Sequence, residues 1–253
     1  KERAETGRIY LMNIDHCNSH SSFIDKVEMS NLCQEITLPT KPIQHIDDDS
    51  GEIALCILSA INIGKIRDVS DLKSLCDLSV RSLDELIDFQ GYPVEAAEIA
   101  TKARRSLGIG YIGLAHYLAK QGVKYEDPKA WELVHDLTEA FQYHLIESTV
   151  NLAKEKGACE YSDRTKYAQG ILPIDTYKKD VDELVPNNLK YDWETLRALV
   201  KEHGVRNSTL SAQMPSESSS VVSNATNGIE PPRDYVSIKK SKKGPLKQVV
   251  PSY

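Results

Sequence analysis

Apolar residues in this chain occur either in short continuous runs or in stripes with helical spacing. The run "RIYLMNID" (Arg8 to Asp15) is bounded by polar residues, which favours a strand buried on both faces. The longer run "EIALCILSAINIG" (Glu52 to Gly64) follows the turn sequence "DDDSG" and predicts a second buried strand. Helical stripes predict three helices, over Asp71–Gln90, Trp131–Lys156 and Trp193–His203, with Gly157 and Gly204 ending the last two.

The C-terminal part of the chain combines strand, helix and turn signals. "RNSTLSAQM" (Arg206 to Met214) reads as a strand that runs into "PSESSS", a helix start. The final stretch, "YVSIKKSKKGPLKQVV", predicts a hairpin with Gly244 and Pro245 at the turn. Buried strands that alternate with helices imply a mostly parallel sheet or barrel, so the predicted fold class is α/β.

Composition and charge narrow the class of protein. The chain has 253 residues, enough for a sizeable core, and 40% hydrophobic with 27% charged residues is typical of a globular protein. A net charge of −6 gives no electrostatic reason to expect nucleic acid or an anionic membrane as the main partner. No apolar run approaches the ~20 residues of a membrane-spanning helix, so no membrane partner is expected.

The cysteines indicate the compartment. There are five, an odd and widely spaced set, and no secretory signal precedes them. A reducing cytoplasm is therefore the expected location, with free thiols at rest. They are Cys17, Cys33, Cys56, Cys76 and Cys159.

Two motifs suggest ligands only weakly. Gly108, Gly110 and Gly113 form a G-x-G-x-x-G, but the sequence before it predicts a helix where a dinucleotide site needs a strand. Close packing of a strand-to-helix turn explains these glycines better. "DHCNSH" holds His16, Cys17 and His20, but the chain has no C-x-x-C to complete a zinc site. We interpret these three as polar loop residues and expect no metal site.

A lysine-rich segment follows near the C-terminus. We interpret its lysines as side chains on the solvent-exposed edge of a hairpin, where their charge prevents pairing with another strand. They are Lys239, Lys240, Lys242, Lys243 and Lys247.

The sequence "PSESSS" has two interpretations of equal weight. Ser216, Glu217, Ser218 and Ser219 follow a predicted buried strand and can open a helix. Free backbone N–H groups at a helix start bind phosphate, and the hydroxyls add donors. Alternatively, Ser216 is a plain N-cap that needs no ligand.

The stretch "SNLCQEITLP" is the strongest candidate for chemistry. In an extended segment Asn31, Cys33 and Glu35 would point to one side, either as a reaction centre or as the exposed face of an edge strand. No cation stands beside Cys33, and Glu35 would raise the pKa of the thiol. This pattern disfavours a thiolate nucleophile, whereas a neutral thiol or a sulfur radical needs no cation.

The whole chain resembles the large (alpha) subunit of class I ribonucleotide reductase. The resemblance covers nearly all 253 residues in order, and motifs this long and numerous are very specific. It is carried by "GRIYLMNIDHCNSH", "SNLCQEITLPTKP", "GEIALCILSAINIG", "RRSLGIGYIG", "QGILPIDTYKKD", "YDWETLR", "HGVRNSTLSAQMPSESSS", "NATNGIEPPR" and "QVVP".

The resemblance implies a fold and a set of site residues. The family fold is a ten-stranded α/β barrel whose finger loop carries a cysteine to the centre, and residues 1–253 would be an incomplete segment of that barrel. Cys33 would be the transient thiyl radical that abstracts the C3′ hydrogen of a ribonucleoside diphosphate. Glu35 would be the base for the 3′-hydroxyl, and Asn31 would hold the ribose. Cys56 would be one member of a redox-active cysteine pair, and Ser216 to Ser219 would bind the diphosphate.

The resemblance also implies partners. A small, metal-containing subunit would supply the radical, thioredoxin or glutaredoxin would supply electrons, and large subunits would form an oligomer. No cofactor would bind this segment directly. Nucleotide effectors such as ATP would bind a region before Lys1. The second redox cysteine, a tyrosine pair and tail cysteines would also lie outside this chain, so the isolated segment is expected to be inactive. The alternative is a non-catalytic split-gene product that assembles with complementary chains.

Overall fold

The structure is a computed structural model. It describes residues 1–55, 57–242 and 244–252. The α-helices are α1 (Glu2–Thr6), α2 (Ile14–His20), α3 (Asp71–Phe89), α4 (Glu95–Arg104), α5 (Leu114–Lys120), α6 (Pro128–Lys156), α7 (Pro173–Thr176), α8 (Trp193–His203) and α9 (Glu217–Val222). The 3₁₀ turns are η1 (Ile63–Lys65), η2 (Ser162–Arg164), η3 (Lys166–Gln169) and η4 (Lys179–Glu183). The strands are β1 (Ile57–Asn62), β2 (Leu107–Ile112), β3 (Val236–Ser241) and β4 (Gly244–Val249).

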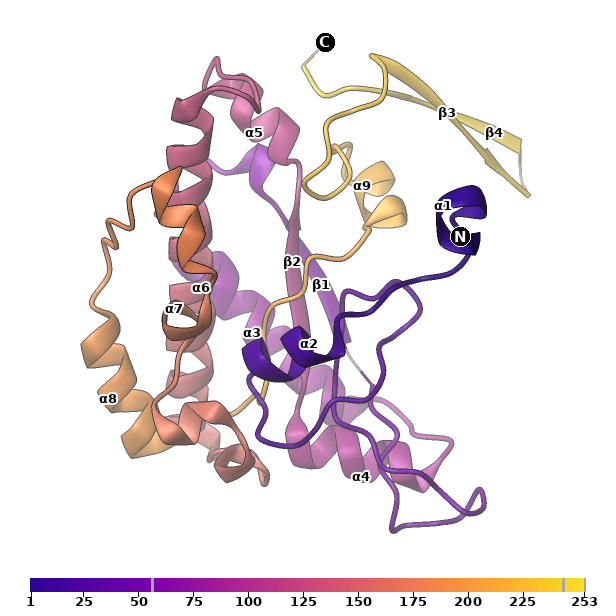
Figure 1. The fold of residues 1–253 in the computed structure, drawn as a ribbon, viewed down its shortest axis with the longest axis vertical. Coiled ribbons are helices and arrows are strands. Elements are labelled where there is room, and N and C mark those ends of the chain that lie inside the picture. The colour runs from indigo at the N-terminus through magenta and orange to yellow at the C-terminus, as the bar shows by residue number, and fades with distance from the viewer. Residues whose placement is uncertain (56, 243, 253) are drawn as a thin grey trace.

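A parallel strand pair forms the centre of the molecule. β1 and β2 pair from Ile57↔Leu107 to Asn62↔Ile112, and α3 and α4 make the connection between them. Figure 1 shows this pair between α6 on one side and the N-terminal segment on the other. Every residue of β2 is buried, as expected for a strand covered on both faces.

A further segment, residues 209–213, runs beside β2 in the parallel direction. Leu107 N–H donates to the Thr209 carbonyl at 3.0 Å, and an isolated parallel bridge joins Ile109 to Ser211. A Cβ on Gly110 would overlap the Ala212 carbonyl oxygen, so the glycine permits this close approach. At the strand-to-helix turn itself, Gly113 has a φ of 85°, and a Cβ there would lie 3.0 Å from the Gly64 backbone nitrogen. The close-packing interpretation of the glycine motif is therefore confirmed.

The three predicted helices are confirmed as α3, α6 and α8. Leu72, Val80 and Ile87 of the apolar stripe of α3 are fully buried, and α3 packs against α6, whereas Leu86 of the predicted stripe is 44% exposed. Gly157 ends α6 with a φ of 87°, a conformation that favours glycine. The predicted hairpin is also confirmed, as β3–β4. Gly244 and Pro245 do not form its turn as predicted, because they belong to β4 and pair with Ser241 and Lys240.

Two predicted strands are wrong or incomplete. Residues 8–13 form no strand, α2 begins at Ile14, and Leu11 is 73% exposed. An apolar run becomes a strand only where another strand pairs with it, and no described segment does so here. Residues 206–214 make only an isolated bridge, because the Gln213 side chain, rather than backbone, donates to the Tyr111 carbonyl at 2.8 Å.

The α/β class is confirmed, but a closed barrel is not observed. Within the described ranges the strands form two sheets of two strands each, β1–β2 and β3–β4. The ten-stranded closure remains an expectation. No helix in the described ranges is both long and apolar enough to cross a membrane.

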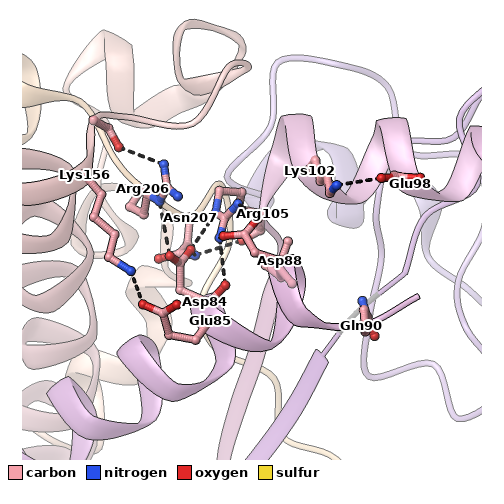
Figure 2. Close-up of polar contacts among 12 residues, drawn as sticks. Asp84, Glu85, Asp88, Gln90, Glu98, Lys102, Arg105, Lys156, Arg206 and Asn207 are labelled. Carbon is pink, nitrogen blue, oxygen red and sulfur yellow. Dashed lines mark hydrogen bonds and ion pairs between the residues drawn. The ribbon is translucent and has the colours of Figure 1, made fainter. Parts of the chain in front are cut away.

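A buried ionic network fixes the amino ends of β2 and of the 209–213 segment (Figure 2). Asp84 of α3 is fully buried and accepts from Arg105 Nε at 2.6 Å, Asn207 Nδ2 at 3.0 Å and Arg206 Nε at 3.2 Å. The Thr149 hydroxyl of α6 donates to Asn207 Oδ1 at 2.9 Å. Because each polar group is partnered, the network joins four distant segments without leaving a buried charge uncompensated.

Candidate active site

The candidate reaction centre stands on a loop, residues 27–38, which we call the finger loop. Its base is apolar, with Val27, Ile36 and Leu38 buried in one cluster together with Phe23. Ala212, from the segment beside β2, packs against this cluster. The base of the loop is therefore attached to the central part of the fold, while Asn31, Leu32 and Cys33 at the tip are exposed.

The tip is a tight turn rather than an extended segment. Gln34 N–H donates to the Asn31 carbonyl at 3.2 Å, and Asn31 N–H donates to the Ile36 carbonyl at 3.1 Å. Gln34 has a φ of 63°, in the left-handed region. The prediction that alternation along an extended segment aligns these residues is wrong, because a turn brings them together instead.

Within the turn, Asn31 and Glu35 are in direct contact. Asn31 Nδ2 donates to Glu35 Oε1 at 2.7 Å, and Asn31 Oδ1 accepts from Ile36 N–H at 3.2 Å. Cys33 lies between them in the chain and is a free, exposed thiol. The sequence prediction that these three residues belong to one site is consistent with this geometry.

The second oxygen of Glu35 has a different environment. Oε2 is shielded from solvent and has no hydrogen-bond partner among the described residues. Glu35 also lines a cavity of about 260 Å³ behind the finger loop. A shielded carboxylate oxygen without a donor is rare in folded proteins and marks a group available to a ligand, to water or to a transferred proton.

The cavity wall is built from segments far apart in the sequence. It carries both polar and apolar side chains, and its lining includes His20, Ser22, Thr37, Gln142, Lys166 and Thr176. Burial lowers the pKa of Lys166. Of these lining residues only His20 and Glu35 stand out in the sequence as candidates for chemistry.

Cys56, the predicted redox cysteine, lies outside the described residues. The other predicted site, Ser216 to Ser219, opens α9 as expected. Ser216 occupies the N-cap position of α9, as the capping interpretation predicted, but its side chain caps no backbone N–H of the helix. Its hydroxyl donates to the Met214 carbonyl at 3.4 Å, and its own N–H donates to Asn227 Oδ1 at 2.8 Å.

The first turn of α9 faces outward. Glu217, Ser218 and Ser219 are exposed, while Ser216 and Ser220 are buried. α9 follows the 209–213 segment directly, and Ala212 of that segment packs on the finger-loop base. One backbone segment therefore connects the finger loop with the start of α9.

His16, Cys17 and His20 lie in α2, not in a loop. Among the residues that the structure describes, no group of three or more His, Cys, Asp or Glu side chains could hold a metal ion. The same motif, "DHCNSH", contains Asn18, which sequence reasoning missed and which contacts the finger loop.

Comparison with known proteins defines the class to which this fold and site belong. The family model described as "Ribonucleotide reductase, barrel domain" matches residues 1–253. The chain therefore belongs to the ribonucleotide reductase family, and the resemblance seen in the sequence is confirmed.

Individual relatives are ribonucleoside-diphosphate reductase alpha subunits. The chain is 62% identical to the one from Haemophilus influenzae over 256 residues, which cover 100% of this chain and 34% of the relative. It is 58% identical to "Ribonucleoside-diphosphate reductase 1 subunit alpha" of Escherichia coli, with the same coverage. It is 47% identical to the subunit of Enterobacteria phage T4, covering 99% of this chain and 33% of that one. The chain thus spans about a third of the length of these relatives.

Proposed function

We propose that this chain carries the radical-forming part of an enzyme that reduces ribonucleoside diphosphates to 2′-deoxyribonucleoside diphosphates for DNA precursor synthesis. The observation that carries the proposal is the finger-loop turn. It sets a free thiol, Cys33, between an amide and a carboxylate that are hydrogen-bonded to each other. The names of the relatives support the same reaction.

In the proposed reaction Cys33 acts as a thiyl radical. It takes the hydrogen atom from C3′ of the ribose, so that an S–H bond forms and a carbon radical remains. Glu35 accepts the proton of the 3′-hydroxyl, and Asn31 holds the ribose by hydrogen bonding. Glu35 later returns its proton to the 3′-oxygen. The 2′-hydroxyl takes a proton from one thiol of a cysteine pair and leaves as water, and the pair then gives its second hydrogen to C2′, supplies the two electrons and becomes a disulfide. Cys56 is one member of that pair, and the hydrogen atom then returns from Cys33 to C3′.

The diphosphate is proposed to bind at Ser216 to Ser219. The first N–H groups of any α-helix lack intrahelical acceptors and favour anions. Exposure of Glu217, Ser218 and Ser219, together with the missing side-chain cap at Ser216, supports this assignment.

The proposal includes partners that this chain does not contain. A small metal-containing subunit supplies the radical, and thioredoxin or glutaredoxin reduces the disulfide. The large subunits form an oligomer in the cytoplasm, with nucleotide effectors such as ATP bound outside residues 1–253. A radical must be protected from water, and Cys33 is exposed here. Since the relatives are about three times as long as this chain, we propose that other parts of the reductase cover the tip.

The experiment is a kinetic isotope measurement on the complete reductase that contains this segment. The assay compares kcat/KM for a ribonucleoside diphosphate carrying hydrogen or deuterium at C3′. Cleavage of the C3′–H bond by Cys33 predicts a lower value for the deuterated substrate. Reduction of the substrate without any C3′ isotope effect, in single turnovers as well as in the steady state, would contradict the proposal.

A further inference from the structure

The side chain of Asn18, in α2, pairs with the backbone of Val27 at the base of the finger loop. Asn18 Nδ2 donates to the Val27 carbonyl at 2.9 Å, and Val27 N–H donates to Asn18 Oδ1 at 2.8 Å. Two neighbouring strands exchange the same two kinds of hydrogen bond. One amide side chain therefore takes the place of a neighbouring strand at this point.

Val27 is where the outgoing arm of the finger loop begins. Its side chain is fully buried in the apolar cluster of the base, and Cys33 follows six residues later. The tip itself is exposed at Asn31, Leu32 and Cys33 and makes its bonds within the turn. The position of the thiol therefore depends on how the base of the loop is held.

Asn18 is itself fixed to a distant part of the chain. Lys166 Nζ donates to the Asn18 carbonyl at 2.9 Å and to the Ser19 carbonyl at 2.7 Å, at the C-terminal end of α2. Lys166 N–H also donates to the Ser22 carbonyl at 2.7 Å. A lysine ammonium at a helix C-terminus satisfies carbonyls that have no intrahelical partner. The contacts thus run from Lys166 through Asn18 to the arm that carries Cys33.

We propose that Asn18 is a positioning residue, which sets the reach of the finger loop and hence the place of the Cys33 sulfur against the substrate. The inference rests on the proposed function of Cys33. Asn18 touches neither the thiol nor the ribose, so it acts through the loop. Loss of its paired hydrogen bonds displaces the tip, and misplacement of a reacting atom by about 1 Å costs on the order of 100-fold in rate.

The test replaces Asn18 in the complete reductase, assayed with its small subunit. Asn18→Ala removes both bonds to Val27. Asn13→Ala is the matched control, because Asn13 lies at the start of the same helix, is exposed, and its side chain makes no cap hydrogen bond. We expect Asn18→Ala to lower kcat by at least about tenfold and to leave KM for the diphosphate within about twofold. Asn13→Ala should match the wild type.

The isotope effect separates positioning from a general loss of structure. If the thiol is misplaced, C3′–H cleavage becomes slower relative to other steps, so the effect of 3′-deuteration should increase in Asn18→Ala. A smaller fraction of active protein would lower kcat and leave both KM and the isotope effect unchanged, which would overturn the proposal. Wild-type kcat in Asn18→Ala would overturn it as well.

A second variant covers the case in which Asn18→Ala does not fold. Lys166→Met leaves the Asn18 side chain in place and removes the ammonium that holds its carbonyl. It should show the same pattern in milder form, with a reduced kcat and an increased isotope effect, and a wild-type pattern would overturn the inference. Cys33→Ser in the same assay separates failure of the proposed function from failure of the inference about Asn18. An active Cys33→Ser enzyme contradicts the proposed function itself. If Cys33→Ser is inactive but Asn18→Ala has wild-type activity, only the role of Asn18 is contradicted.

Discussion

The side-chain amide of Asn31 donates a 2.7 Å hydrogen bond to Oε1 of Glu35, across a turn that has Cys33 within it. The other carboxylate oxygen, Oε2, has no partner among the described residues. The amide therefore orients the carboxyl group and leaves one oxygen available to accept a proton. This relationship links the local turn chemistry to the proposed reaction.

Replacement of Asn31 tests that relationship. Asn31→Ala removes the bond to Glu35 and the bond from Ile36 N–H, so the carboxylate loses its orientation. We expect kcat/KM of the complete reductase to fall by about 10- to 100-fold. The control is Ser30→Ala, because the Ser30 hydroxyl donates to the Asn31 carbonyl at 3.1 Å and does not contact the Glu35 carboxylate within the described residues. Equal activity of the two variants would contradict the role of Asn31.

The diphosphate assignment predicts a charge effect limited to one end of α9. Ser219→Glu adds a negative charge in the first turns, where the phosphates are proposed to lie. We expect KM for the ribonucleoside diphosphate to rise by about tenfold or more, and less so at high salt. Val222→Glu adds the same charge at the far end of the helix, at a side chain that is 89% exposed, and should change KM little. Similar KM values for both variants would contradict binding of the diphosphate at the start of α9.

The Asp84 network predicts a large loss of stability from one carboxylate. Asp84→Ala leaves the buried Arg105 and the largely buried Arg206 without this partner, so the free energy of unfolding should fall by about 3–5 kcal/mol. Asp88 also pairs with Arg105, but its side chain is 49% exposed. Asp88→Ala should therefore cost below about 1 kcal/mol. Urea denaturation of the two variants measures these losses. Equal losses in the free energy of unfolding would show that burial of the carboxylate does not determine the size of its contribution.

The turn at residues 44–50 predicts a pH dependence. The Ser50 hydroxyl, with the backbone N–H groups of Gln44 and Ser50, lowers the pKa of Asp48 to about 2. Because this pKa is lowered on folding, the carboxylate stabilises the fold above its unfolded pKa, and the contribution disappears as pH falls through about 4 toward 2. The melting temperature of the wild type should exceed that of Asp48→Ala above pH 5, with the difference shrinking toward pH 2. A constant difference across this range would contradict the assignment.

The helices could be predicted because their signals are local. The apolar stripe of α3 and the glycines that end α6 and α8 are visible in a window of a few turns. The strand predicted from the apolar run at residues 8–15 is wrong for the opposite reason. An apolar run does not say whether another strand will pair with it, and within the described part of the chain none does.

The site was only partly visible in the sequence. Asn31, Cys33 and Glu35 could be singled out by residue type, but the turn that joins them depends on a positive φ at Gln34, a residue with no strong preference for it. Asn18 and Lys166 could not be found at all, because the contact between them spans 148 residues. Long-range contacts of this kind leave no periodic signal.

The most direct test of the proposed radical role of Cys33 is the turnover of Cys33→Ser in the complete reductase, measured together with its affinity for the ribonucleoside diphosphate. Serine is close to cysteine in shape and size, but its hydroxyl cannot form a sulfur radical. We predict no detectable turnover, a dissociation constant within about twofold of the wild type, and normal turnover for the control Cys17→Ser. A Cys33→Ser enzyme that retains even a few per cent of the wild-type rate would contradict the radical role of Cys33.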